Sequence, residues 1–177
     1  MKILAFGAST SSTSINRQLA NHAANQLEGA EVTDLDLRSY ELPIFSTDLE
    51  EEAGSPADAQ AFLDAIRAHE GIVVSLAEHN GSYAAAFKNL YDWTSRIEQK
   101  LWSDKPMLLL ATSPGGRGGA TVLAAAGATF PHMGGNIAAS FSLPSFYDNF
   151  SADEGVTDAD LKAGLAEAIA AFGQSLK

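Results

Sequence analysis

Five short apolar runs recur along the chain, and a segment with apolar residues at helical spacing follows each of them. The runs cover residues 2–6, 32–37, 71–76, 106–111 and 136–141. The third and fourth are almost continuously apolar, which is typical of strands covered on both faces. Strands that alternate with helices predict a parallel sheet with helices on both faces. Because crossovers are right-handed, few topologies remain, and we expect a doubly wound α/β fold with five strands in the order 2-1-3-4-5.

The segments between the runs predict the helices. We expect helices over residues 15–28, 57–69, 82–100 and 120–130, and a last helix that starts at residue 157. Gly29 lies just beyond the first as a stop signal. Ser82 can cap the third, and Thr157 with an acid three residues later is typical of a capped helix start. Residues 38–56 predict a long loop whose acidic cluster is solvated.

Charge and composition exclude several classes of protein. The 177 residues include 22 Asp and Glu against 11 Lys and Arg, so the formal net charge is −11. Binding to nucleic acid or to an anionic membrane surface needs clustered basic residues, which the chain lacks. No run approaches the about 18 apolar residues of a membrane span, and the N-terminal run is too short for a signal peptide. We expect a cytoplasmic protein with a single domain over residues 1–177 and no nucleic-acid or membrane partner.

Several chemistries are absent from the sequence. The chain has no cysteine, which excludes disulfides, thiolate metal sites and cysteine nucleophiles. The four histidines show no metal-ligand spacing, so we expect no metal site. Neither the Gly-x-Ser-x-Gly pattern of hydrolases nor the His-Glu-x-x-His pattern of metalloproteases occurs. The nucleotide P-loop and the dinucleotide-binding glycine pattern are missing as well.

The loop after the first predicted strand has the composition of a phosphate site. In the expected strand order, ligands bind at the carboxyl ends of the strands, between the first and the third. This loop contains six consecutive hydroxyl residues, 9–14, directly before a helix. Hydroxyl groups and the free N–H groups of a helix N-terminus can bind phosphate without a fixed positive charge. A polar turn with a helix cap is the alternative, because Ser and Thr favour both.

The loops after the third and fourth predicted strands are also rich in ligand-binding residue types. Residues 77–83 include Glu, His, Asn and Ser, and residues 113–119 contain four glycines in five positions. Glycine lets the main chain approach a flat ligand closely. A flexible turn is the alternative for the glycine-rich segment. Since all three loops are expected to meet at one edge of the sheet, we predict a single binding site there.

Together these loops resemble the NADPH-dependent FMN reductase family, which has a flavodoxin-like fold and includes quinone, azo-dye and chromate reductases. The family's phosphate loop, Gly-Ser-x-Arg-x-x-Ser-x-Asn, aligns with residues 8–16. Its Pro-Glu-Tyr-Asn-x-Ser segment aligns with residues 77–82, and the Lys-Asn and Asp-Trp pairs that follow align with 88–89 and 92–93. Its Ser-Pro-Gly-x-x-Gly-Gly loop aligns with residues 113–119. The resemblance covers residues 2–145.

The resemblance implies three groups of FMN-binding residues. The phosphate contacts are Ser9, Ser11, Ser14, Ile15 and Asn16; the contacts to the ribityl chain and the ring are Glu78, His79, Asn80, Gly81 and Ser82; and those at the pyrimidine edge of the ring are Ser113, Pro114, Gly115, Gly116, Arg117 and Gly119. By the same resemblance, the Lys-Asn and Asp-Trp pairs are expected to be structural or to lie at a subunit interface.

Two departures from the family pattern matter. Ser11 stands where the family has Arg, and Ala77 and His79 stand where it has Pro and Tyr. Loss of the Arg removes a cationic contact to the phosphate. Arg17, in the first turn of the helix, either replaces part of this charge or simply lies at the surface.

The resemblance further implies an activity. Hydride would pass from NADPH or NADH to bound FMN and then to a quinone or similar small acceptor, with no catalytic residue from the chain because the chemistry occurs at flavin N5. Family members commonly form homodimers or homotetramers. Two alternatives stay open: a flavodoxin-like electron carrier without direct NAD(P)H turnover, which the acidity would suit, and a protein that uses the same phosphate loop for a ligand other than flavin.

Overall fold

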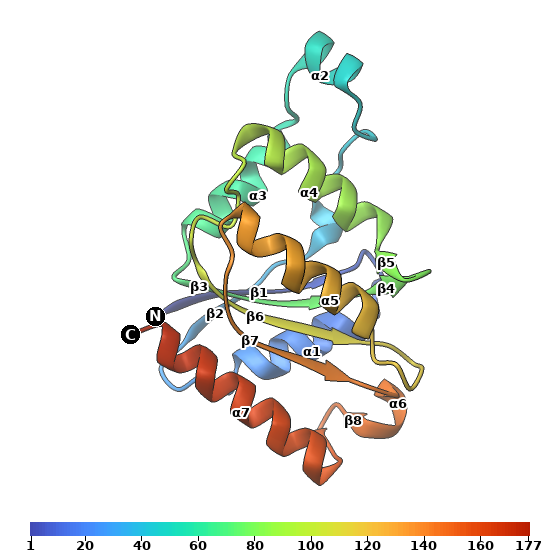
Figure 1. The fold of residues 1–177 in the computed structure, drawn as a ribbon, viewed down its shortest axis with the longest axis vertical. Helices are drawn as coiled ribbons and strands as arrows, with labels where there is room; N and C mark the ends of the chain where they lie inside the picture. The colour runs from blue at the N-terminus through green and yellow to red at the C-terminus, as the bar shows by residue number, and fades with distance from the viewer.

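Five parallel strands form one sheet in the order β2-β1-β3-β6-β7, which is 2-1-3-4-5 when the strands of this sheet alone are counted (Figure 1). The computed structural model describes all residues, 1–177. The strands are Lys2–Ala8 (β1), Glu31–Asp34 (β2), Gly71–Leu76 (β3), Pro106–Thr112 (β6) and Asn136–Leu143 (β7). The predicted doubly wound sheet is therefore confirmed.

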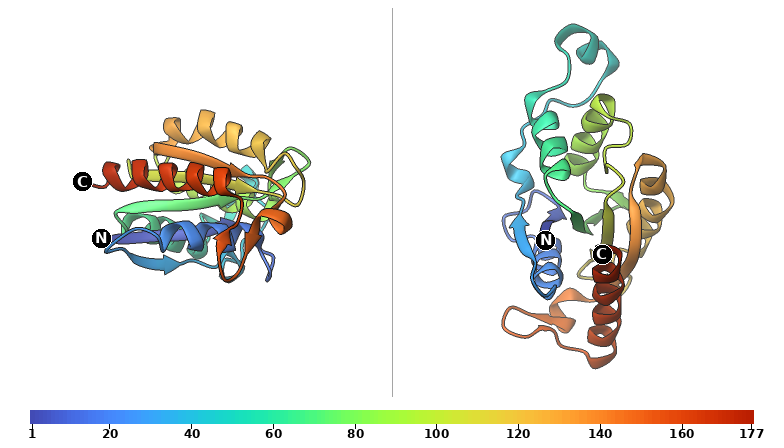
Figure 2. Two further views of the ribbon diagram at one scale, coloured as in Figure 1. Left: turned by 90° about the horizontal axis from the view of Figure 1, so that it is seen from below. Right: turned by 90° about the vertical axis from the view of Figure 1, so that its left-hand side faces the viewer.

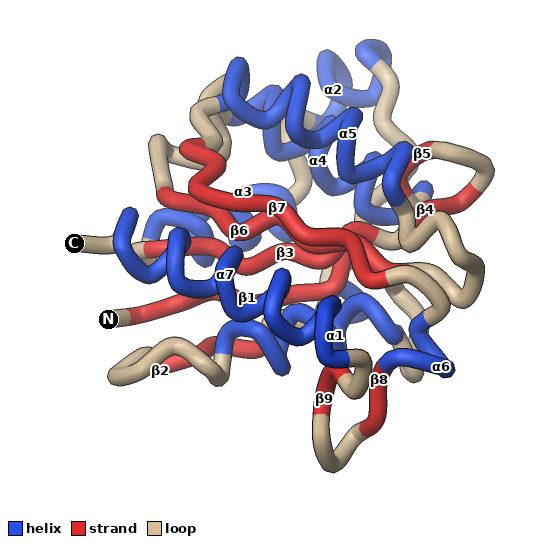
Figure 3. The backbone as a smooth tube through the Cα atoms, turned by 60° about the horizontal axis from the view of Figure 1, so that its bottom comes forward, coloured by secondary structure: helices blue, strands red, loops and turns tan.

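Helices cover both faces of the sheet (Figures 2 and 3). They are Ile15–Ala24 (α1), Ala57–Arg67 (α3), Ala85–Ile97 (α4), Ala120–Thr129 (α5) and Ala159–Ser175 (α7). α1 and α7 pack on one face, and α3, α4 and α5 pack on the other. Along β1, Leu4 and Phe6 join one core, whereas Ile3 and Ala5 join the other, so both faces of the strand are buried. None of the helices is long and apolar enough to cross a membrane.

The ends of two predicted elements are wrong. The first helix ends at Ala24 instead of residue 28, and only turns separate its end from β2. The second strand ends at Asp34, and the chain continues into a short 3-10 helix, Leu37–Ser39 (η1). The break follows from the sequence, because Asp34 and Leu35 interrupt the alternation of apolar and polar side chains that a half-buried strand requires.

Two predicted helix caps are also wrong. α4 begins at Ala85 without a side-chain cap, and Ser82 lies in a short strand, Ser82–Tyr83 (β5). Asp158, not Thr157, caps α7, since its carboxylate accepts two main-chain N–H groups of the first turn at 3.1 and 2.9 Å. Asp binds the free N–H groups of a helix start as well as Thr does, and its charge also complements the helix dipole.

The predicted long loop before α3 contains a short helix, Thr47–Ala53 (α2). Residues 40–56, here called the α2 arm, project from the body of the molecule (Figures 1 and 2). The arm is attached to α4, because the main-chain oxygen of Pro43 accepts hydrogen bonds from Asn89 Nδ2 at 2.9 Å and Trp93 Nε1 at 2.8 Å. Most of its acidic side chains are exposed, as predicted.

A small substructure follows the last strand of the sheet. It consists of the helix Phe146–Asn149 (α6) and a hairpin of Phe150–Ser151 (β8) and Gly155–Val156 (β9). The hairpin packs on α1, where the rings of His22 and Phe150 meet edge to face at 5.3 Å. The start of the substructure is held at the carboxyl edge of the sheet, since the N–H groups of Ser145 and Phe146 donate to the main-chain oxygens of Gly115 and Ser113 at 3.0 Å.

The side chain of Asn16, buried at the start of α1, links this helix to two strands. Its Nδ2 donates to the main-chain oxygen of Thr112 at 3.1 Å, and its Oδ1 accepts from the N–H of Thr112 at 3.1 Å and from Ser75 Oγ at 2.7 Å. Thr112 is the last residue of β6, and Ser75 is next to last in β3. These three hydrogen bonds fix the N-terminus of α1 above the carboxyl ends of the two strands.

We expect Asn16→Ala to lower the free energy of unfolding by about 2–4 kcal/mol, because it leaves buried polar groups of Ser75 and Thr112 without partners. Urea unfolding followed by circular dichroism would measure the change. Asn25→Ala is the matched control at the other end of α1, where the exposed amide bonds only a main-chain oxygen, and it should cost less than about 1 kcal/mol. An Asn16→Ala variant as stable as its Asn25→Ala control would contradict this role.

Candidate functional site

The hydroxyl loop, residues 9–14, joins β1 to α1 and presents three O–H donors. Main-chain N–H groups of the loop and of the first turn of α1 donate to Ser9 Oγ, Ser11 Oγ and Ser14 Oγ at 3.1, 3.3 and 3.1 Å. Ser14 is the cap of α1. A hydroxyl oxygen that accepts an N–H group keeps its own hydrogen for another acceptor. The loop is therefore held by its hydroxyl oxygens, and the hydrogens of Ser9 and Ser14 stay available to a ligand. Ser11 Oγ lies 3.4 Å from Thr13 Oγ1, so these two hydroxyl groups share one hydrogen bond and leave the other hydrogen available.

The first turn of α1 adds two main-chain donors. The N–H groups of Ile15 and Asn16 have no hydrogen-bond partner within the protein. Unpaired N–H groups and the dipole at a helix N-terminus attract anions. Gly7 permits this arrangement, because a Cβ there would lie 2.3 Å from the main-chain nitrogen of Arg17. The end of β1 can thus approach the start of α1 without a clash.

The hydroxyl loop and the first turn of α1 line a cavity of about 220 Å³ at the carboxyl edge of the sheet. Among the residues predicted from sequence, its lining contains Ser9, Ser11, Ser14, Ile15, Asn16, Glu78, His79, Ser113 and Pro114. The other predicted residues, Asn80, Gly81, Ser82, Gly115, Gly116, Arg117 and Gly119, belong to the same two loops but lie outside the lining. The structure therefore brings the predicted phosphate residues together, and only the nearest parts of the second and third loops join them.

The second loop is a β-hairpin, whereas the sequence analysis treated it as a plain loop. Glu78–His79 (β4) pairs antiparallel with β5. Asn80 and Gly81 form the tip, with φ of +52° and +74°. Two consecutive residues at positive φ are typical of the tight hairpin turn in which Asn-Gly is favoured.

Glu78 fastens this hairpin to α5. Its carboxylate accepts the main-chain N–H of Val122 at 2.9 Å, in the first turn of α5. The cap position of α5 is Gly119, which has no side chain to bind the free N–H groups. Glu78 therefore serves as the cap of α5 from a distant part of the sequence, and this contact positions one wall of the cavity.

The glycine loop, residues 113–119, contains two pairs of glycines with different roles. Gly118 and Gly119 have φ of +57° and +74°, and a Cβ on Gly118 would lie 2.4 Å from Ser142 Oγ. A Cβ on Gly115 or Gly116 would meet nothing within 4 Å, and the N–H groups of these two residues have no partner in the protein. Gly118 and Gly119 permit the turn, and Gly115 and Gly116 leave their main-chain N–H groups open to a ligand.

We expect Gly118→Ala to cost about 2–4 kcal/mol of stability, because Ala is strained at this φ and its methyl group overlaps Ser142. Gly116→Ala, the matched control two residues away, should change stability by less than about 0.5 kcal/mol. Thermal unfolding of both variants would compare them. Equal stability of the two would show that the backbone at Gly118 does not need glycine.

Arg17, in the first turn of α1, is already paired with two acidic residues. Arg17 Nε lies 2.9 Å from Asp34 Oδ1, and its Nη1 lies 2.7 Å from Asp36 Oδ2. Burial acts to raise the pKa of Asp34, but hydrogen bonds from Arg17 and Asn21 and the charge of Arg17 together outweigh it and leave the pKa below its usual value. Hydrogen bonds from Arg38 and then Arg17 hold the pKa of Asp36 well below its usual range. The cavity lining itself contains no Lys or Arg, since Arg117 is exposed on the glycine loop outside it.

Sequence analysis missed four residues of the cavity. They are Thr13, Ala77, Thr112 and Tyr147. Tyr147 belongs to α6, which follows the fifth strand of the sheet. The strand order contained a signal for it, because the loop after this strand also ends at the carboxyl edge. The Asn80-Gly81 pair was likewise a signal for the hairpin.

The Lys-Asn and Asp-Trp pairs of α4 make contacts within the chain. Lys88 Nζ lies 2.7 Å from Asp92 Oδ1, in an exposed ion pair one helical turn apart. Asn89 and Trp93 hold the α2 arm through the oxygen of Pro43. None of the four lines the cavity.

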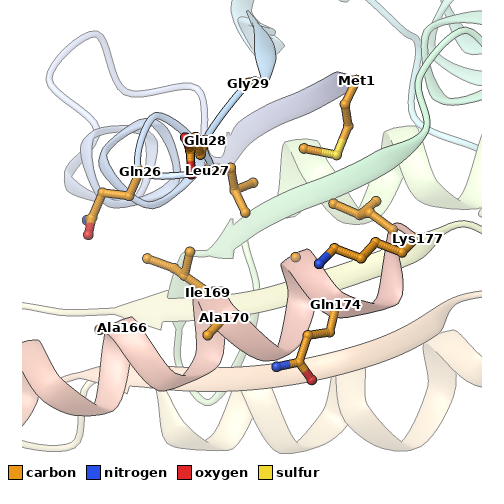
Figure 4. A pocket seen from close by; sticks show the side chains of 12 residues that line it. Met1, Gln26, Leu27, Glu28, Gly29, Ala166, Ile169, Ala170, Gln174 and Lys177 are labelled. Atoms are coloured by element: carbon orange, nitrogen blue, oxygen red, sulfur yellow. The ribbon is translucent and has the colours of Figure 1, made fainter.

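A larger groove of about 690 Å³ lies at the other end of the molecule, between the end of α1 and α7 (Figure 4). Its lining includes both terminal residues and aliphatic side chains such as Leu27 and Ile169. It lacks the set of convergent donors found at the hydroxyl loop. Because parallel sheets bind ligands at the carboxyl ends of their strands, we assign the candidate site to the smaller cavity. No group of three or more His, Asp or Glu side chains in the protein is arranged to hold a metal ion.

Known proteins share both the sequence pattern and the fold. The pattern that defines the NADPH-dependent FMN reductase family matches residues 1–148. The chain is 35% identical to a quinone reductase of Escherichia coli (strain K12) over 80 residues, which make up 45% of this chain and 43% of that protein. It is 33% identical to the probable NADPH:quinone oxidoreductase 1 of Oryza sativa subsp. japonica over 124 residues, which make up 67% of this chain and 61% of that protein. The chain thus matches about half the length of these relatives.

Solved structures agree with this assignment. FerB, a flavoenzyme NAD(P)H:(acceptor) oxidoreductase from Paracoccus denitrificans, has a TM-score of 0.76 at 26% identity, with 99% of this chain and 96% of that chain covered. A flavodoxin from Pseudomonas aeruginosa has a TM-score of 0.56 at 20% identity, with 97% and 99% covered, which shows the shared fold alone. The order of the strands, with hydrogen-bond donors at the carboxyl edge of the sheet, therefore defines a flavodoxin-like protein. More narrowly, the chain belongs to the NADPH-dependent FMN reductase family.

Proposed function

We propose that this protein is an FMN-dependent NAD(P)H oxidoreductase that passes hydride from NADPH or NADH, through bound FMN, to a quinone or similar small acceptor. The observation that carries the proposal is the donor set at the start of α1, where three hydroxyl groups and two main-chain N–H groups line one cavity. Phosphate oxygens accept several hydrogen bonds at once and suit such a set. Membership of the family supports the flavin, and the quinone reductases among its relatives support the acceptor.

The residues present fit the two ends of FMN. The phosphate requires donors at an anion-attracting helix terminus, which Ile15 and Asn16 supply with their main chain. The flat ring requires an open surface, which the glycine loop offers at Gly115 and Gly116, where no side chain intervenes. Bound FMN supplies hydride acceptance and donation at its N5 atom, a chemistry that no side chain of the chain provides.

In this proposal the chain binds and orients the flavin. Ser9, Ser11 and Ser14 donate their hydroxyl hydrogens to the phosphate, and Asn16 contributes only its main-chain N–H because its side chain is used within the protein. The hairpin from Glu78 to Ser82 lies along the ribityl chain and the ring.

The glycine loop would supply hydrogen-bond donors to the flavin ring. In the proposal its residues, from Ser113 to Gly119, border the pyrimidine edge of the ring. The free N–H groups of Gly115 and Gly116 would be the hydrogen-bond donors at this edge, where a reduced ring carries negative charge. No general acid or base from the chain is required, which agrees with a cavity lined mainly by hydroxyl and main-chain groups.

A flavodoxin-like electron carrier is the alternative from the sequence. The family match favours the reductase, because it names NADPH dependence. We also propose that residues 1–177 act as a single domain. We place the protein in the cytoplasm, where NADPH and NADH are available. As the resemblance implies, we propose that it assembles as a homodimer or homotetramer.

Reconstitution with FMN tests the function. The purified protein, incubated with FMN and passed through a desalting column, should stay yellow. Under anaerobic conditions, NADPH or NADH should bleach the visible absorbance of the flavin directly, and a benzoquinone should restore it. Free FMN at the same concentration is the control. A protein that retains no FMN would contradict the proposal, and retained FMN that neither coenzyme reduces would support the electron carrier instead.

Single hydroxyl deletions test the phosphate site. We expect Ser9→Ala to weaken FMN binding about tenfold, because it removes one donor to a charged acceptor. Ser12→Ala is the matched control, since Ser12 is a neighbouring hydroxyl that lies outside the cavity lining. Quenching of flavin fluorescence on titration would give both dissociation constants. If the two variants bound FMN equally well, the assignment of the phosphate to this loop would be wrong.

A further inference from the structure

Tyr147 is an exposed aromatic residue on the wall of the candidate site. Its residue surface is 70% accessible, and the only other large apolar residues that are clearly exposed are Met1 and Ile44. Tyr147 lines the same 220 Å³ cavity as the hydroxyl loop. It comes from α6, in the loop after β7, which supplies none of the donors described above (Figure 1).

The backbone that carries Tyr147 is fixed to the glycine loop. The N–H of Ser145 donates to the oxygen of Gly115 at 3.0 Å, and the N–H of Phe146 donates to the oxygen of Ser113 at 3.0 Å. Ser145 has a φ of +47°, a left-handed conformation that is uncommon for serine. Such a conformation persists where the surrounding contacts determine it.

The neighbouring aromatic rings also restrict Tyr147. Phe146 is buried and stacks on Phe150 with ring centroids 4.7 Å apart and an angle of 19° between the planes. The ring of Tyr147 meets Phe146 edge to face at 5.6 Å and 86°. An exposed tyrosine is thus carried on a buried phenylalanine, and its position does not depend on a ligand.

The cavity lacks the charge that a phosphate ordinarily attracts. A phosphate monoester carries about 1.5 to 2 negative charges at neutral pH. The lining contains no Lys or Arg, and the guanidinium of Arg17 is paired with Asp34 and Asp36. The lining therefore offers a phosphate the neutral donors, the dipole of α1 and the imidazole of His79, and it also includes the carboxylate of Glu78. Without a Lys or Arg in the lining, each additional hydrogen-bond donor on the cavity wall contributes to the affinity for phosphate.

The phenol of Tyr147 is a donor of the required kind. Its hydroxyl makes no hydrogen bond within the protein, so it is available to a ligand. A phenol is more acidic than the hydroxyl of Ser or Thr, and hydrogen bonds to an ionised acceptor are stronger than those between neutral groups. The hydroxyl loop and α1 provide donors from one part of the chain, and α6 brings this donor from another.

We propose that Tyr147 is a further ligand of the FMN phosphate, with its phenolic O–H donating to a phosphate oxygen. This inference rests on the proposed FMN-binding function and adds a contact from outside the hydroxyl loop. It assigns α6 a binding role and explains why a large aromatic residue remains exposed at this place.

Binding of FMN and of riboflavin separates a phosphate contact from other roles. Riboflavin has the same ring and ribityl chain but no phosphate. We expect Tyr147→Phe, which removes only the hydroxyl, to weaken FMN about tenfold and to leave riboflavin affinity unchanged, as measured by fluorescence quenching on the apoprotein. Tyr40→Phe is the control, because Tyr40 is a half-buried tyrosine outside the cavity.

Three results would overturn the inference. If Tyr147→Phe weakened the binding of FMN and riboflavin equally, the substitution would act on folding or on the ring site, and a phosphate contact would be excluded. If Tyr147→Phe bound both flavins like the wild type while Tyr147→Ala weakened both, the ring would cover the ligand and the hydroxyl would have no role. If the wild-type protein bound FMN no more tightly than riboflavin, the phosphate site itself would be absent. Failure of the wild type to bind either flavin would instead contradict the proposed function together with this inference.

Discussion

Three hydrogen bonds from one amide, that of Asn16, hold the start of α1 above the ends of β3 and β6. The rest of the site depends on this contact, because the hydroxyl loop, the cap at Ser14 and the two free N–H groups all take their positions from the start of α1. An Asn in a loop-to-helix segment is commonly read as a cap or a ligand residue. Here its side chain is part of the protein interior, and only its main chain faces the cavity.

The acidity of the chain and the anionic ligand it is proposed to bind are compatible because the charges are kept apart. The hydroxyl loop has no acidic residue, whereas many acids lie on the α2 arm and on the segment between β7 and α7. Arg17, the cation nearest the loop, is neutralised by Asp34 and Asp36. The one carboxylate in the cavity lining, that of Glu78, accepts the N–H of Val122, and the hydroxyl loop meets an anion with the direction of its donors. Net charge describes the surface of this protein and says little about its cavity.

The sequence predicted what depends on local pattern. Short apolar runs that alternate with helical segments predicted the five strands, and the rule of right-handed crossovers predicted their order. The run of hydroxyl residues predicted a phosphate loop, and four residues of that run line one cavity. The failures have tertiary causes. Glu78 caps α5 from 44 residues away in sequence, and Tyr147 joins the cavity only because the chain returns to this edge after β7. To predict either contact, one must know which loops meet in the folded protein. The hairpin at Asn80 and Gly81, by contrast, has a local signal that was available.

The α2 arm has a consequence for how the molecule moves. Only Tyr40 and Leu42, at its start, pack against a core, and Asn89, Trp93 and Arg96 of α4 attach the rest of it. A segment with so few anchors can detach without any strand leaving the sheet. Its amide hydrogens should then exchange with solvent through a local opening, at rates independent of the global unfolding equilibrium, while those of β1 and β3 exchange only when the whole fold opens. The arm and the sheet thus behave as separate cooperative units within one chain.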